Sequence, residues 1–274
     1  MNDWRKMAQV IKDLPRPISK RGSLDLNVIN CSPNVGEGVF VFDTRDGGLT
    51  GLDAATGREL WKLRCWRTGA AVLRWVHRGK TYFITGIGQC VEPRTWQVRW
   101  TGSFGGTPAV CEDYLVTYGD DRDGKGMQIY RISPERAELL HTLSPRYVVC
   151  TWMGGPAIYR GHAYGLTEDK GGDGWTLFAV ELATGKVTST KHQGRFAMSY
   201  WPVVADGRLW GQGISMFKAA PTDFVNLGVL GSAPGTTENY AVGTSCAYAD
   251  GRVFYRGNDC LLCYDFRAKT RDAP

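Results

Sequence analysis

The 274-residue chain has few of the features by which membrane proteins and common enzyme classes are recognised. No apolar run is long enough for a transmembrane helix, and the first fifteen residues carry charges throughout where a signal peptide has its apolar core. The four histidines lie at no metal-ligand spacing, and no two cysteines are adjacent. There is also no Walker loop and no Ser-His-Asp order. The sequence therefore predicts no metal site and no catalytic residues.

Charge and cysteine content give no sign of nucleic-acid binding or of a disulfide framework. The formal net charge is +6, but the chain has no arginine-rich run and no base-stacking motif, so we expect no nucleic-acid partner. The eight cysteines are spread along the chain, which is typical of small buried side chains in strands. Cys260 and Cys263 lie three residues apart and would face opposite sides of a strand.

Glycine and tryptophan, in contrast, are abundant, with 35 and 10 residues respectively. Many glycines indicate many turns, and many turns indicate many short strands. Many tryptophans indicate large apolar side chains used at several equivalent places.

A repeated motif places these residues at fixed offsets. Residues 51–61 (GLDAATGRELW) and 90–100 (CVEPRTWQVRW) share a small residue, an acid, a threonine and a final tryptophan. A third copy begins at Ala179, with Ser189 where tryptophan would fall, and degenerate copies begin at Tyr130 and Cys263. The gap between Ala179 and Cys263 is about twice the repeat length, which predicts a further copy near Pro221, with Asp223 as its acid.

A second marker, a small residue or proline before a short apolar run, occurs six times in the same phase. The six positions are Ser32-Pro33, Ala70-Ala71, Thr107-Pro108, Gly155-Pro156, Trp201-Pro202 and Cys246-Ala247. Each unit indicates four strands; in the first they are expected around 32–35 and at 39–42, 49–53 and 59–63. Four-stranded units of about 40–45 residues are typical of propeller blades. We therefore predict an all-β fold, a six-bladed β-propeller of four-stranded antiparallel blades.

The motif has a structural interpretation. A tryptophan on an outer strand can lie flat on the neighbouring blade, the acid and threonine can accept hydrogen bonds from the turn, and glycine can take a left-handed conformation. The residues that we assign to blade docking are Asp53, Thr56, Gly57, Trp61, Glu92, Thr95, Trp100, Glu181, Thr184 and Gly185.

These residues resemble the tryptophan-docking motif of pyrroloquinoline-quinone-like (PQQ-like, quinoprotein-type) propellers over about residues 30–267. The family includes quinoprotein dehydrogenases, which use the quinone, calcium, a catalytic Asp and usually adjacent cysteines. It also includes non-enzymatic scaffolds such as the outer-membrane assembly lipoproteins. Because the adjacent cysteine pair is missing, we predict a non-enzymatic scaffold without cofactor; the alternative is a PQQ- and calcium-dependent oxidoreductase or a degenerate relative of one. The resemblance implies a periplasmic or cell-envelope location, although the chain shows no signal peptide.

Two domain assignments follow from the repeat. Residues 31–274 are the expected propeller, and residues 1–30 are an N-terminal segment with a short helix over Asn2–Leu14. A strand over Ser23–Ile29 would complete the last blade, whose own strands run out near the end of the chain. The alternative is a piece of a seven- or eight-bladed propeller.

Candidate binding residues lie in the segments that lead from one blade to the next. Aromatic and polar side chains recur there, which predicts a surface for another protein or a small ligand. The alternative is that these rings pack between blades. The candidates are Trp66, Arg67, Phe104, Trp152, Tyr200 and Trp201.

Overall fold

Every regular element in the described part of the chain is a β-strand. The computed structural model describes residues 34–44, 48–64, 72–86, 88–102, 105–118, 126–144, 155–168, 174–193, 203–211, 215–229, 246–256 and 261–266. The expected helix over Asn2–Leu14 and strand over Ser23–Ile29 lie outside these residues, as does the division at residue 30. In the described ranges no helix could cross a membrane.

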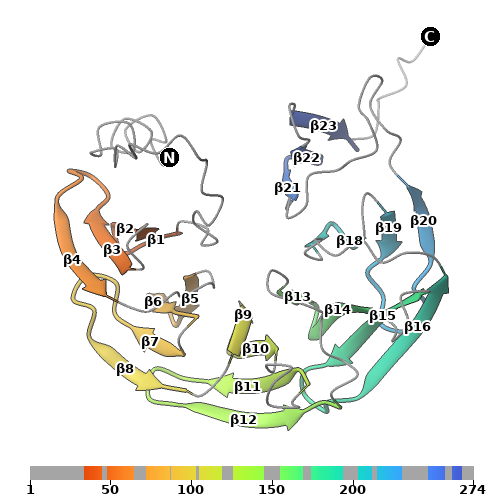
Figure 1. Ribbon diagram of the computed structural model, residues 1–274, viewed down its shortest axis with the longest axis horizontal. Helices are drawn as coiled ribbons and strands as arrows, with labels where there is room; N and C mark the ends of the chain where they lie inside the picture. Colours follow the sequence, from red (N-terminus) through yellow and green to blue (C-terminus); the bar gives the residue numbers. More distant parts are fainter. Residues whose placement is uncertain are drawn as a thin grey trace, which may run out of the picture. The chain divides into compact units, whose positions relative to one another are not determined.

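The strands form six antiparallel sheets, five of four strands and one of three, each ordered as in the chain (Figure 1). Sheet 1 contains β1 (Asn34–Gly36), β2 (Val39–Thr44), β3 (Gly48–Asp53) and β4 (Glu59–Arg64). Sheet 2 contains β5 (Leu73–His77), β6 (Lys80–Ile84), β7 (Gln89–Val91) and β8 (Val98–Thr101). Sheet 3 contains β9 (Gly105–Cys111), β10 (Tyr114–Tyr118), β11 (Gln128–Ile132) and β12 (Ala137–Thr142).

The remaining three sheets follow in the same way. Sheet 4 contains β13 (Ala157–Tyr159), β14 (His162–Glu168), β15 (Gly174–Glu181) and β16 (Val187–Gln193). Sheet 5 contains β17 (Val203–Ala205), β18 (Arg208–Gly211), β19 (Ser215–Lys218) and β20 (Asn226–Val229). Sheet 6 contains β21 (Cys246–Ala249), β22 (Arg252–Arg256) and β23 (Leu261–Asp265).

The first hairpin of every sheet closes with a two-residue turn whose first residue has a positive φ. Such turns match the twist of the strands on either side, and five of the six have glycine second. The residues with positive φ are Glu37 (50°), Arg78 (48°), Glu112 (51°), Arg160 (47°), Asp206 (49°) and Asp250 (53°). All six predicted units therefore begin with the same local structure.

One predicted copy of the motif is misplaced. Pro221 and Asp223 lie in the turn between β19 and β20, not in a strand. The true equivalent of the first residue of the motif is Met216, which pairs with Gly228 beside a bulge. Gly51 pairs with Trp61 in the same way. The copy escaped detection because glycine replaces the tryptophan and because the turn is longer by two residues. The hydrogen bond that closes this turn runs from Lys218 N to Val225 O, whereas the equivalent bond in sheet 1 runs from Asp53 N to Arg58 O.

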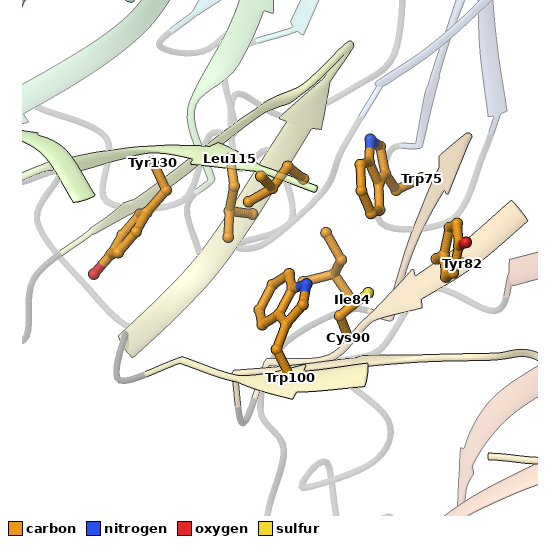
Figure 2. Packing of buried hydrophobic residues seen from close by; sticks show 8 residues of the cluster. Trp75, Tyr82, Ile84, Cys90, Trp100, Leu115 and Tyr130 are labelled. Atoms are coloured by element: carbon orange, nitrogen blue, oxygen red, sulfur yellow. The ribbon is translucent and has the colours of Figure 1, made fainter. Parts of the chain in front are cut away.

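The core is made of side chains between neighbouring sheets. The chain divides into two compact units, Met1–Leu115 with Tyr130–Leu139, and Val116–Ile129 with Leu140–Pro274. In the first unit Trp75 and Trp100 of sheet 2 pack with Tyr130 of sheet 3 (Figure 2), all less than 9% exposed. The second unit has its own cluster, with Trp175 of sheet 4 against Phe217 of sheet 5.

First strands of neighbouring sheets lie next to each other within each unit. β1 contacts β5 and β5 contacts β9 in the first unit, and β13 contacts β17 in the second. The fourth strand is the far edge of its sheet (Figure 1). Each four-stranded sheet therefore has one edge beside a neighbour's first strand and one edge that pairs with no other strand in the described part of the chain.

Candidate functional site

All six candidate binding residues fall in segments that join one sheet to the next. These segments lie outside the described residues, so the prediction for them stands untested. Trp66 and Arg67 lie between β4 and β5, Phe104 between β8 and β9, Trp152 between β12 and β13, and Tyr200 and Trp201 between β16 and β17.

The direction of the strands says at which end of a sheet these segments attach. In a four-stranded antiparallel meander, the fourth strand ends at the side where the first strand began. The chain leaves β4 and β8 at this end and continues into the first strand of the next sheet. The turns between third and fourth strands, which carry the repeated acid and threonine, lie at the opposite end.

In sheet 1 this turn is held by Asp53. Its Oδ1 accepts hydrogen bonds from Ala55 N (3.1 Å), Thr56 N (3.0 Å) and Thr56 Oγ1 (3.0 Å). The hydrogen bonds from the Thr56 backbone and side chain hold the pKa of Asp53 below its ordinary value. Gly57 follows with a φ of 74°, a conformation that glycine adopts without strain.

The equivalent turns of sheets 2 and 4 keep the threonine but use the acid differently. Glu181 Oε2 accepts the Thr184 hydroxyl at 2.6 Å, so sheet 4 repeats the arrangement of sheet 1. Glu92 instead forms a 2.8 Å ion pair with Lys80 of the same sheet, and this hydrogen bond raises the pKa of Lys80. Trp96 takes the place of Gly57 with a φ of 57°.

Three ring nitrogens reach across to such a turn in the next sheet. Trp61 Nε1 donates to Pro93 O at 2.7 Å, and Trp100 Nε1 donates to Ser133 O at 2.8 Å. His141 Nε2 lies 3.0 Å from Ala183 O, and because a carbonyl oxygen only accepts, this bond requires the proton on Nε2. We call these three interactions the ring contacts.

The rings of Trp61 and His141 also approach a glycine too closely for any side chain to fit there. A Cβ on Gly51 would overlap the indole of Trp61, which also contacts the tilted ring of Trp96 with ring centroids 4.4 Å apart. A Cβ on Gly185 would lie 2.8 Å from Cγ of His141. Glycine is therefore required at both places by the close approach of a ring.

Sequence reasoning missed His141 and a second set of contacts nearer the first strands. Trp75 Nε1 donates to Glu112 O at 2.7 Å, and His77 Nδ1 lies 2.8 Å from Asp113 Oδ1. The sequence does place Trp75 and His77 two apart, on one face of an expected strand, but nothing in it indicates their partners 36 or 37 residues later. His141 was hidden because the turn of sheet 3 is shorter, with Ser133 N bonded to Arg136 O.

The described residues around the ring contacts are suited to packing between sheets and not to nucleophilic or metal chemistry. Burial raises the pKa of the Cys90 thiol to about 12, so this cysteine stays protonated and is a poor nucleophile. Within the described ranges no three His, Cys, Asp or Glu side chains are grouped as metal ligands would be.

No protein-family model and no curated protein sequence matches the chain. Solved structures do match. BamB from Moraxella catarrhalis aligns with a TM-score of 0.59 at 14% identity, over 86% of this chain and 70% of that one. The chain is a β-propeller. The N-terminal domain of Nup159 aligns with a TM-score of 0.50 at 12% identity, over 85% of this propeller and 74% of its own chain.

A computationally designed protein, Ika8, also aligns, with a TM-score of 0.49 at 12% identity over 87% of the propeller and 83% of the designed chain. The six sheets confirm the prediction of about six blades. Identities this low support the fold and not a family, so the relation to PQQ-like propellers stays a prediction.

Proposed function

We propose that the protein is a non-enzymatic scaffold that recognises another protein or a small ligand through the segments joining its sheets. Aromatic and basic side chains in these segments, such as Trp66, Arg67 and Trp152, would supply the binding surface. Aromatic residues and arginine are the groups most often responsible for binding energy at protein interfaces.

One observation carries this proposal. Described tryptophans already have partners inside the fold: Trp61, Trp75 and Trp100 each donate to a carbonyl of the next sheet. Sheets 1 to 3 thus have tryptophan contacts of their own within the described residues, which supports a role in recognition for the tryptophans of the joining segments. The propeller relatives at low identity are compatible with this role, and the PQQ-like ancestry of the repeat belongs to the same proposal.

Replacing Trp152 and Tyr200 together with alanine tests whether these rings are surface groups. We expect the double variant to keep the thermal unfolding midpoint of the unmodified protein to within a few degrees. The matched control is Trp175→Ala, whose side chain is 6% exposed and should cost about 3–5 kcal/mol. Global unfolding of the double variant would mean that the two rings pack between sheets.

A photo-crosslinking amino acid at position 67, in place of Arg67, tests whether the joining segments recognise a partner. We expect one protein to be crosslinked in cells from this position, and the crosslink to be lost in the Trp152→Ala, Tyr200→Ala background. The control position is Arg136, which is three-quarters exposed in a turn at the opposite end of its sheet. Equal crosslinking from both positions would contradict the proposal.

A separate measurement tests the alternative that the protein is a PQQ-dependent oxidoreductase. The protein is incubated with PQQ and calcium, and bound cofactor absorbance and dye reduction are recorded. Dye reduction above that of the cofactor alone would overturn the non-enzymatic assignment.

A further inference from the structure

The outer strand of sheet 5 differs from the other outer strands in its charge. β20 (Asn226–Val229) contains no charged residue and is the last strand of its sheet (Figure 1). Charged residues on edge strands discourage pairing with another chain. In the described part of the chain every other fourth strand carries one, namely Glu59 and Lys62 in β4, Arg99 in β8, Glu138 in β12 and Lys191 in β16.

Apolar side chains are exposed at the same edge. Leu227 is 44% exposed and Val225, just before the strand, is 48% exposed. Leu227 is also the extra residue of a bulge, because Met216 pairs with Gly228 and Phe217 with Asn226. The backbone groups of an extra residue have no partner in the neighbouring strand. At the equivalent place in β4, Leu60 is half-buried.

Gly228 adds no side chain to this strand. It stands opposite Met216 as Trp61 stands opposite Gly51, yet a Cβ built on it would meet no atom of the described residues within 4 Å. Its φ of 120° favours glycine, and a glycine within a strand often marks the close approach of another chain. At the position where sheets 1 and 2 have a tryptophan, β20 therefore has no side chain.

We propose that β20 pairs with β20 of a second copy of this chain, antiparallel across a two-fold axis. A two-fold interface brings the same surface of both copies together, so an uncharged strand meets no like charge from its partner. Self-pairing of β8 would instead bring two Arg99 side chains together. Asn226 is the only polar side chain within β20, which gives the strand little with which to select a different partner.

The size of this contact sets its strength. A pair of four-residue strands buries much less than the roughly 1,200–2,000 Å² of a stable protein interface. The dimer should therefore be weak, with a dissociation constant on the order of 100 µM, and should form only in concentrated solution.

Sedimentation velocity between about 5 µM and about 500 µM tests the proposal, because this range spans the expected dissociation constant. We expect the sedimentation coefficient of the full chain to rise towards that of a dimer, and Leu227→Lys to remain monomeric throughout. The matched control is Leu139→Lys: Leu139 is 49% exposed on β12, beside Glu138, and this variant should associate as the unmodified protein does.

Circular dichroism shows whether each variant is folded, and Val225→Lys replaces Leu227→Lys if the latter is not. A protein that stays monomeric at about 500 µM would overturn the proposal, since that is above the expected dissociation constant. Equal loss of association in the Leu139 variant would overturn it as well, because any exposed leucine would then serve. Neither outcome bears on the function proposed for the joining segments.

Discussion

At the scale of single residues, a glycine and a tryptophan that face each other depend on one another. Gly51 has no side chain because the indole of Trp61 lies over it, and the same indole donates to Pro93 O. Gly51 and Trp61 were both in the motif identified from the sequence. Their mutual contact was not part of the prediction, because a strand motif says nothing of which ring covers which backbone.

A double-mutant cycle measures this dependence. Trp61→Phe removes the hydrogen bond and should cost about 0.5–1.5 kcal/mol, and Gly51→Ala should cost about 1–3 kcal/mol by overlap with the indole. Phenylalanine lacks the second ring, so the double variant should lose less than the sum of the two, by about 1 kcal/mol. Urea unfolding of the four proteins gives the coupling. Additivity within about 0.3 kcal/mol would contradict a direct contact.

At the scale of elements, the strands with intact motif residues were the ones that the sequence placed correctly. In sheet 1 the expected strands at 49–53 and 59–63 correspond to β3 and β4 within one residue at each end. The first hairpin of sheet 5 turns at Asp206 and Gly207, a residue pair typical of two-residue hairpin turns. Prediction failed in sheet 5, where the outer strand has lost its tryptophan and the turn before it is also longer. The copy in sheet 4 was found without a tryptophan because its turn keeps the original length.

The candidate binding residues show the other limit of the sequence. Their position in the chain between a fourth and a first strand follows from the repeat alone. Whether Trp152 or Tyr200 contacts a partner depends on side-chain direction in a segment without strand periodicity. The sequence pattern contains no information of that kind.

The contact between sheets 3 and 4 is a prediction at this scale. His141→Phe keeps an aromatic ring over Gly185 but loses the bond to Ala183 O, and should lower the free energy of unfolding by about 1 kcal/mol. His162→Phe is the control, because His162 Nδ1 contacts Arg160 O within its own turn. The variants are compared by thermal and urea unfolding. An equal loss in both would show that the sheet-to-sheet bond contributes nothing of its own.

At the scale of the whole molecule, burial of ionisable groups makes stability depend on alkaline pH. Burial raises the pKa of Cys90 from 9.0 to about 12, and it raises the pKa of Tyr130 and Tyr164 above 10.0. Above about pH 9 the unfolded chain therefore binds fewer protons than the folded one. Stability is then lost as pH rises, fully present below the unfolded pKa and falling towards the folded one.

Unfolding by urea from about pH 7 to about pH 11 should show this fall beginning near the ordinary thiol pKa. Cys90→Ala should make the fall shallower, although the smaller side chain lowers stability at every pH. Cys263→Ala is the control, because this cysteine is exposed and its variant should keep the original slope. A slope unchanged by Cys90→Ala would mean that the thiol ionises as readily in the folded protein as in the unfolded one.

The indole bonds between sheets have an optical consequence. Trp61, Trp75 and Trp100 each hold their ring nitrogen against a carbonyl of the following sheet, partly shielded from water. The emission of an indole moves to longer wavelength when water can reorient around its excited state. Parting of two sheets at one of these junctions would therefore change the colour of the light that its tryptophan emits. The first three sheets carry their own fluorescent reporters of the seams between them, without any added label.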